Sequence, residues 1–176
     1  MSCRAVLSIG SNVGDSLGIL RGVIDSARTD GLLLAASAVY ATSPWGGVEQ
    51  DDFLNVTMLV EGFDTAGDWL AWAQAREAAA HRTRDVRWGP RTLDVDVVTV
   101  AVDGREIRSD DPVLTLPHPR AHERAFVLVP WLDVDRDARL AEVAVRELVD
   151  RLGPEEVAGV RRLDPRAPGA RGGVAE

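Results

Sequence analysis

Several features that would direct a protein to other environments are scarce in this chain. It has one cysteine, Cys3, which excludes an internal disulfide framework and fits a reducing cytoplasm. No apolar run approaches the roughly 20 residues that a membrane span needs, and the charge at Arg4 interrupts any signal-peptide pattern. A basic excess is also missing, since 28 acidic and 20 basic residues give a net charge of -8. We therefore expect a cytoplasmic protein that binds neither membranes nor nucleic acids.

The chain is that of an ordinary globular protein. Its 176 residues with 45% hydrophobic content suit one domain with a single core. We expect this domain to span residues 1–163. The segment "DPRAPGARGGVAE", residues 164–176, is rich in Gly, Pro and Ala, which is typical of a disordered tail.

Hydrophobic periodicity predicts an α/β (α+β) fold. Asp15 or Ser16 can cap the first helix, and Thr65 with Asp68 forms a possible capping box for the second. The expected strands and helices occur in the order strand, helix, strand, strand, helix, strand, followed by a last helix: 4–10, 16–28, 32–42, 53–61, 64–81, 92–102 and 142–153. The first six elements follow the ferredoxin-like order, which predicts a mostly antiparallel sheet with helices packed on one face.

An acidic pair stands at the start of the strand 92–102. Alternation projects Asp94 and Asp96 from one face with their Cα atoms about 7 Å apart, and places Val98 and Val100 on that same face. Two like charges beside a core are costly unless a cation neutralises them. Carboxylate oxygens on a rigid strand suit Mg²⁺. A solvent-facing strand end whose acids pair with arginines would give the same pattern, so the pair alone leaves both interpretations open.

The residues before the acids carry positive charge. Four arginines lie in a loop with Trp88 and a rigid Gly-Pro: Arg82, Arg84, Arg87 and Arg91. The planar guanidinium group suits bidentate binding of phosphate oxygens, and phosphoryl transfer needs such cations together with a metal. A solvated charged loop is the plainer alternative for the arginines alone. Arginines and acids together favour a metal-assisted phosphate site.

Five motifs in sequence order carry a family resemblance. They are "SIGSNVGD", "YATSPWGG" with "DDFLN", "QAREAAAHRTR", "RTRDVRWGPRTLDVD" and "LTLPHPRAHERAFVLVP". Together they are similar to the 6-hydroxymethyl-7,8-dihydropterin pyrophosphokinases of folate biosynthesis, over nearly the whole chain short of the tail. The resemblance implies a ferredoxin-like fold. It also implies transfer of the β,γ-pyrophosphoryl unit of ATP to the hydroxymethyl group of the pterin, with release of AMP.

The resemblance also implies site residues and ligands. Asp94 and Asp96 would hold two Mg²⁺ ions, and Arg82 and Arg91 would be catalytic. Other matched positions would bind the co-substrate ATP: Gln74, Glu77, Arg84, Trp88, Thr115, His118 and Arg124. With only ATP and the pterin implied as partners, we expect a monomer.

A pterin site can also be approached from its chemistry. A flat polar heterocycle needs apolar faces above and below, with hydrogen-bonding groups around its edge. Phe53 and Asn55 share one face of their strand. By resemblance, Phe126 is the second aromatic of a sandwich around the pterin, and the loop residues that close around it are Thr42, Pro44, Trp45 and Trp88. Taken singly, Phe53 and Phe126 are more typical of core residues.

Some residues depart from the family pattern. His81 stands where glycine is common, Phe53 replaces a common tyrosine, and no arginine occurs near Val113. The loop between Arg84 and Arg87 is a residue shorter than in some members. None of these departures removes an expected metal ligand.

Alternatives remain at this point. A binding module for RNA or small ligands could use the same scaffold, although net acidity disfavours RNA. A metal-dependent nucleotide hydrolase could also use the acidic pair.

The turn "GSNVGD" joins strand to helix but lacks the P-loop lysine and glycines, so we interpret it as structural. His81 and His122 have no partners at zinc-ligand spacing.

Overall fold

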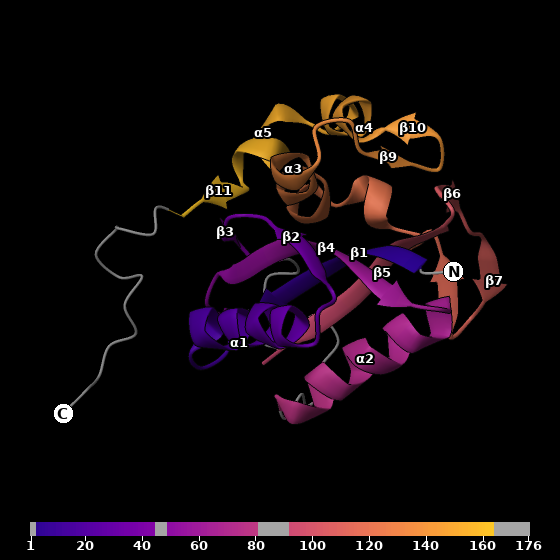
Figure 1. Cartoon of the computed structure of the whole chain (residues 1–176). Coiled ribbons are helices and arrows are strands. Elements are labelled where there is room, and N and C mark those ends of the chain that lie inside the picture. Colours follow the sequence, from indigo (N-terminus) through magenta and orange to yellow (C-terminus); the bar gives the residue numbers. More distant parts are fainter. Residues whose placement is uncertain (1–2, 45–48, 81–91, 164–176) are drawn as a thin grey trace.

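Figure 1 shows the computed structural model, which describes residues 3–44, 49–80 and 92–163. The helices are α1 (Ser16–Thr29), α2 (Ala66–Ala79), η1 (Ala121–Glu123), α3 (Ala125–Val134), α4 (Val145–Arg151) and α5 (Pro154–Ala158). The strands are β1 (Cys3–Ser11), β2 (Leu33–Ala36), β3 (Tyr40–Thr42), β4 (Phe53–Phe63), β5 (Asp94–Val102), β6 (Arg105–Glu106), β7 (Ser109–Asp111), β8 (Leu114–Leu116), β9 (Arg139–Leu140), β10 (Val143–Ala144) and β11 (Arg161–Arg162). Among these residues, no helix combines the length and apolar character that crossing a bilayer requires.

The main sheet is antiparallel throughout. Its order is β11-β3-β4-β1-β5-β6, and β2 also pairs with β4. The predicted ferredoxin-like order is confirmed. The single strand expected over 32–42 is divided into β2 and β3, because the backbone and hydroxyl of Ser37 both bond to the backbone of Thr57. Ser37 then donates its own hydroxyl to the Ala38 carbonyl, and regular pairing stops there.

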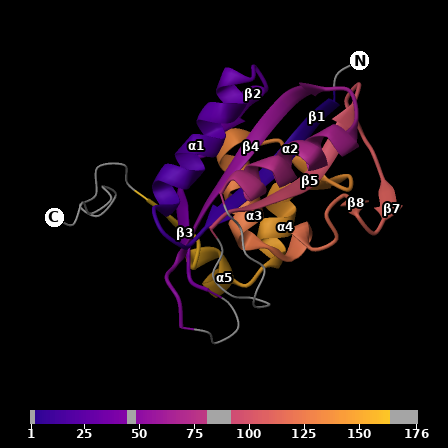
Figure 2. The ribbon, with the colours of Figure 1, turned by 90° about the horizontal axis from the view of Figure 1, so that it is seen from below.

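Helices cover both faces of the sheet, whereas the sequence predicted them on one face. Helices α1 and α2 lie together on one side, in front of the sheet in Figure 2, while α3 and α4 lie on the other. The core beneath α1 and α2 includes Leu7, Ile9 and Trp69, all fully buried. The opposite core contains Val98 and Leu128. The prediction missed this second layer because it did not anticipate α3.

A bulge in β5 changes which residues face each core. Leu7 pairs with Val97 while the preceding Val6 pairs with Thr99, so Val98 is the extra residue. The expectation that Val98 shares the face of the aspartates is confirmed by its place in the α3 and α4 core. The same expectation for Val100 is wrong. The bulge moves Val100 into the core under α1 and α2.

The two long helices begin where local sequence signals predicted. The Asp15 carboxylate accepts from the backbone amide of Gly18, and Thr65 and Asp68 make the reciprocal contacts of a capping box. These caps fix α1 and α2 at the strand ends that precede them, so local signals and the sheet agree about their positions.

Candidate active site

Two of the predicted site residues, Asn55 for the pterin and Asp94 for the metal, lie in one row across the sheet. Gly10 of β1 is paired on one side with Asn55 of β4 and on the other with Asp94 of β5. Directly paired residues project to the same face, and adjacent strands are about 5 Å apart. Asn55 and Asp94 are thus separated by one residue, and that residue has no side chain. This face is the one that α3 and α4 cover, because Thr57, two residues beyond Asn55 on the same face of β4, donates to the Val127 carbonyl.

Gly10 keeps the row open. A Cβ atom at this position would lie 3.1 Å from Oδ1 of Asn55, closer than ordinary van der Waals contact. The sequence reasoning did not single out Gly10. Its place at the end of an apolar strand, in "SIGSN", was the available signal.

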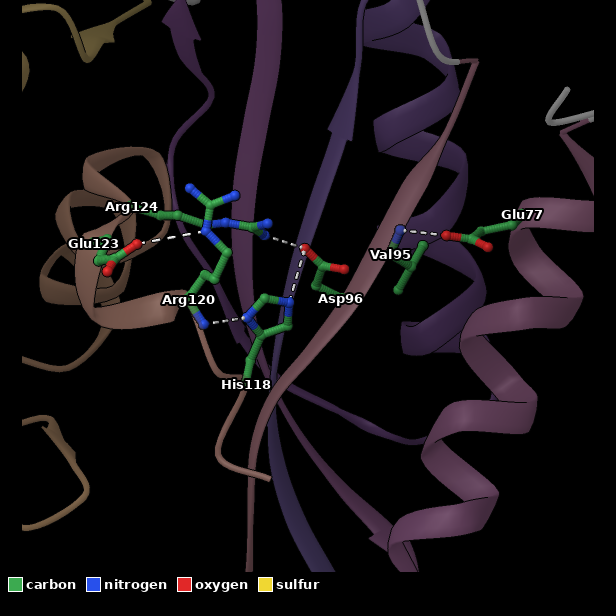
Figure 3. Close-up of polar contacts among 7 residues, drawn as sticks. All are labelled: Glu77, Val95, Asp96, His118, Arg120, Glu123 and Arg124. Carbon is green, nitrogen blue, oxygen red and sulfur yellow. Dashed lines mark hydrogen bonds and ion pairs between the residues drawn. The ribbon is translucent and has the colours of Figure 1, made fainter. Parts of the chain in front are cut away.

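Asp96 lies between Arg124 and His118. Arg124 donates from Nη1 to its Oδ2 at 2.8 Å, and Nε2 of His118 lies 3.9 Å from the same oxygen (Figure 3). Burial raises the pKa of Asp96 above its ordinary value, and the charge of Asp94 raises it further. His118 and Arg124 oppose this rise without cancelling it. An ionised Asp96 therefore still favours a further cation.

Two hydrogen bonds to the backbone fix the position of His118. Its backbone amide donates to the Val98 carbonyl at 2.7 Å, and its Nδ1 accepts from the Arg120 amide at 3.2 Å. In the neutral ring this leaves the proton on Nε2, which faces Asp96. Burial lowers the pKa of His118, against the attraction of Asp96. The arrangement leaves Nε2 of His118 facing the acidic pair.

Arg124 connects the two ends of the predicted site. Its guanidinium carbon lies 5.6 Å from the centre of the Phe126 ring while its Nη1 binds Asp96. The cation therefore contacts a predicted metal ligand and a predicted pterin-stacking ring at once. The sequence placed Arg124 at the nucleotide only, and its contact with Phe126 follows from the turn of backbone that begins α3.

Glu77 has a structural contact in addition to its predicted role. Its side chain is buried, and Oε1 accepts from the backbone amide of Val95 at 2.9 Å. Val95 stands between the two aspartates, so this bond ties α2 to the strand that carries them (Figure 3). Gln74, one turn earlier, is exposed. Both remain predictions as nucleotide contacts.

The pterin side is built on the pairing of β3 with β4. Thr42 pairs with Phe53, and Nδ2 of the buried Asn55 donates to Oγ1 of Thr42 at 2.9 Å. This contact fixes the rotation of the Asn55 amide and turns its Oδ1 toward Gly10. Pro44 is half-buried just beyond β3.

Both expected metal ligands, Asp94 and Asp96, lie in the described part of the chain. Asp94 and Asp96 supply hard carboxylate oxygens on one face of a strand. No group of three or more His, Cys, Asp or Glu side chains arranged for a metal ion occurs within residues 3–44, 49–80 and 92–163. Mg²⁺ commonly uses one or two carboxylates and completes its coordination with water and substrate phosphates. The donor set fits an ion shared with a nucleotide better than a closed structural site.

Most of the remaining predicted residues lie outside the part of the chain that the structure describes. Arg82, Arg84, Trp88, Arg91 and Trp45 fall outside the described residues, and so does the predicted tail. Thr115 is described, in β8, where its hydroxyl donates to the Asp111 carbonyl at 3.0 Å.

The turn "GSNVGD" has the structural role that the sequence suggested. Asn12 is buried and donates from Nδ2 to the side chain of Gln50 and to the Asp51 carbonyl. It thereby holds the segment that leads into Phe53. The sequence did not predict this hydrogen bond, because Asn12 and Gln50 are far apart in the chain and come together only in the folded protein.

Comparison with known proteins gives consistent relatives. A family model described as 7,8-dihydro-6-hydroxymethylpterin-pyrophosphokinase matches residues 6–136. The 2-amino-4-hydroxy-6-hydroxymethyldihydropteridine pyrophosphokinase of Mycobacterium leprae (strain TN) is 48% identical over 169 residues, covering 90% of this chain and 87% of that protein. The protein of the same name from Mycobacterium tuberculosis (strain ATCC 25618 / H37Rv) is 44% identical over 172 residues, covering 92% and 90%.

Solved structures agree in fold. The wild-type HPPK-DHPS of Plasmodium falciparum is similar with a TM-score of 0.62 at 14% identity, over 86% of this chain and 41% of that one. This chain thus spans about two fifths of the length of that protein. At this identity the likeness concerns the fold alone. The family model and the mycobacterial relatives cover most of the sequence, and the chain belongs to the 7,8-dihydro-6-hydroxymethylpterin-pyrophosphokinase family.

Proposed function

We propose that this chain transfers the pyrophosphoryl unit of ATP to the hydroxymethyl group of 6-hydroxymethyl-7,8-dihydropterin in folate biosynthesis, releasing AMP. The observation that carries the proposal is the row Asn55–Gly10–Asp94. It places an amide suited to reading a heterocycle one residue from an acidic pair suited to a metal–phosphate complex. A transfer between two bound substrates requires this proximity.

Asp94 and Asp96 are proposed to hold Mg²⁺ together with the phosphates of ATP. The metal, when bound, would neutralise phosphate charge and lower the pKa of the pterin hydroxyl. Arg124 and His118 border the same carboxylate and are proposed to donate to the nucleotide. Arg82 and Arg91 are proposed as catalytic cations, with Arg84, Trp88, Gln74, Glu77 and Thr115 as nucleotide contacts, on the strength of the sequence motifs.

The pterin is proposed to lie between Phe53 and Phe126, with its edge read by Asn55. The Asn55 amide is preset by Thr42, so it need not be ordered when the substrate binds. Pro44, Trp45 and Trp88 are proposed to line the rest of the pocket. All of these positions belong to one chain, which is consistent with a monomer.

Product analysis tests the proposal. The full-length protein is incubated with ATP and Mg²⁺, with and without the dihydropterin, and adenine nucleotides and phosphate are separated. We expect AMP and pterin diphosphate in equal amounts only when the pterin is present. Release of phosphate at the same rate without pterin would instead identify a nucleotide hydrolase, and no turnover in either mixture would point to a binding protein.

A further inference from the structure

The C-terminal strand β11 lies beyond the segment 6–136 that the family model matches, yet it joins the main sheet. Arg161 pairs with Ala41 and Arg162 with Tyr40, and the amide of Leu163 donates to the Val39 carbonyl at 2.9 Å. In Figure 1 the chain passes from α4 through α5 and returns to β3 at the outer side of the sheet. A segment from the end of the domain thus lies beside the strand that ends at Thr42.

Strand β3 has only three residues and depends on neighbours on both sides. β4 pairs with one of its edges and β11 with the other. Without β11, β3 would be a short edge strand, which is the least protected kind of strand in a sheet. The position of Thr42, and through its hydroxyl the orientation of the Asn55 amide, would then depend on one set of pairings.

Arg161 also reaches the second strand that flanks the pterin side. Its Nη2 lies 2.6 Å from Oδ2 of Asp52, the residue before Phe53. Since Phe53 pairs with Thr42, Arg161 binds the end of β3 with its backbone and the start of β4 with its side chain. These two strand ends carry three of the proposed pterin contacts.

Arg162, the second residue of β11, makes an ion pair with helix α3. It lies 3.3 Å from Oδ1 of Asp133, and the second oxygen of Asp133 accepts from the Ala38 amide at 2.8 Å. Asp133 belongs to α3, the helix that begins directly after Arg124. Strand β11 therefore joins β3 to both the sheet and α3, on the face where the site lies.

We propose that Arg161, acting with β11 and its partner Asp52, is a positioning residue that sets the affinity of the enzyme for the pterin. The inference rests on the proposed function. It makes the segment after residue 136 part of the substrate-binding apparatus, without direct contact with either substrate. Its loss raises the pterin KM and leaves the ATP KM and the turnover number nearly unchanged, because Asp94, Asp96 and Arg124 lie on other elements.

The backbone link is tested with a matched pair of full-length variants. Leu163→Pro removes the amide that bonds to Val39, whereas Leu163→Ala shortens the side chain and keeps that amide. Losing one backbone hydrogen bond should raise the pterin KM of the proline variant about fivefold over that of the alanine variant, with the ATP KM within about twofold. Equal pterin KM values in two folded variants would overturn the backbone part of the proposal.

The ion pair is tested by Arg161→Ala, Asp52→Ala and the double variant. Because an exposed ion pair contributes little, we expect a rise in pterin KM of about threefold in each, and the same rise in the double variant. Arg151→Ala is the control, since it breaks an exposed pair with Glu147 on α4 and should leave the KM unchanged. Calorimetry of pterin binding to the complex with a non-hydrolysable ATP analogue must show the same ratios.

These outcomes separate the two proposals. If the wild-type protein forms no AMP with pterin present, the proposed function fails whatever the variants do. If it forms AMP but Arg161→Ala, Asp52→Ala and Leu163→Pro all bind pterin as wild type, only the positioning role fails. Should the proline variant not fold, as judged by its melting curve, the two alanine substitutions decide the question.

Discussion

At the end of the central sheet where the candidate site lies, the two faces of the same three strands differ in character. Ile9, Val56 and Val95 occupy one row and face α1 and α2, in a core closed to solvent. The next residue on β1 is Gly10, which lies in the row of Asn55 and Asp94 on the other face. Alternation of side chains thus separates packing from chemistry by one residue. A substitution in either of these two rows should therefore change one property and spare the other.

The largest effect is expected at the acidic pair. Asp96→Ala should reduce turnover by about a thousandfold or more, because it removes a proposed metal ligand and the charge that the metal would offset. The melting temperature should not fall. Steady-state AMP formation at saturating Mg²⁺ is the measurement, with Asp25→Ala on the exposed side of α1 as the control. Unchanged turnover would contradict the proposed metal site on this face of the sheet.

On the opposite face the effect should fall on stability. Ile9→Ala empties a fully buried position and should lower the free energy of unfolding by about 3 kcal/mol. Urea denaturation gives this value, and activity per folded molecule should remain within about threefold of wild type. A large loss of turnover in the folded fraction would show that the faces are not independent.

Gly10→Ala tests the row itself. The new Cβ would lie 3.1 Å from Oδ1 of Asn55, so either the amide or the strand must shift by a few tenths of an ångström. We expect a loss of about tenfold in kcat/KM for the pterin, since small displacements at a reacting site are costly. Gly22→Ala, in a position on α1 with open space around it, is the matched control. Equal kinetics in both variants would contradict the proposed role of the row.

The smallest effect concerns pH and stability. Folding raises the pKa of Asp96, so its ionised form is disfavoured in the folded protein and this group lowers stability as pH rises toward and through that raised pKa. Asp96→Asn, which resembles the protonated acid, should be the more stable protein at neutral pH in EDTA-containing buffer. Its advantage should shrink as pH falls from the raised pKa toward the ordinary aspartate pKa, and it should be gone below that ordinary pKa, where the acid is protonated in both states. Chemical denaturation across pH 3 to 8 checks the sign, and an advantage that grows on acidification would be inconsistent with it.

Local sequence signals predicted the structure correctly where all of the interacting residues belong to a single helix or strand. The capping box at Thr65 and Asp68 satisfies its own helix end, and it forms as predicted. The alternation of β4 and the placement of Asp94 and Asp96 on one face follow from strand geometry alone. For the same reason, the sequence alone is enough to identify the acidic pair.

Other features had no local signal. Helix α3 begins without a side-chain cap and has Pro130 in its interior, so no local signal marks it as a helix. It is helical because its apolar residues, such as Leu128 and Trp131, fill the second core. The bulge at Val98 likewise arises from pairing with β1, and one inserted residue reversed the face of Val100.

The sequence by itself determined the order of the elements, the caps of the long helices and the chemistry of the acidic strand. These depend on neighbours a few residues apart, so short-range spacing contains them. Only the tertiary structure decided that Gly10 lies between Asn55 and Asp94, that Arg124 spans Asp96 and Phe126, and that Arg161 reaches Asp52. Such contacts join residues far apart in the chain, and their register is set by sheet pairing and burial, which no local pattern encodes.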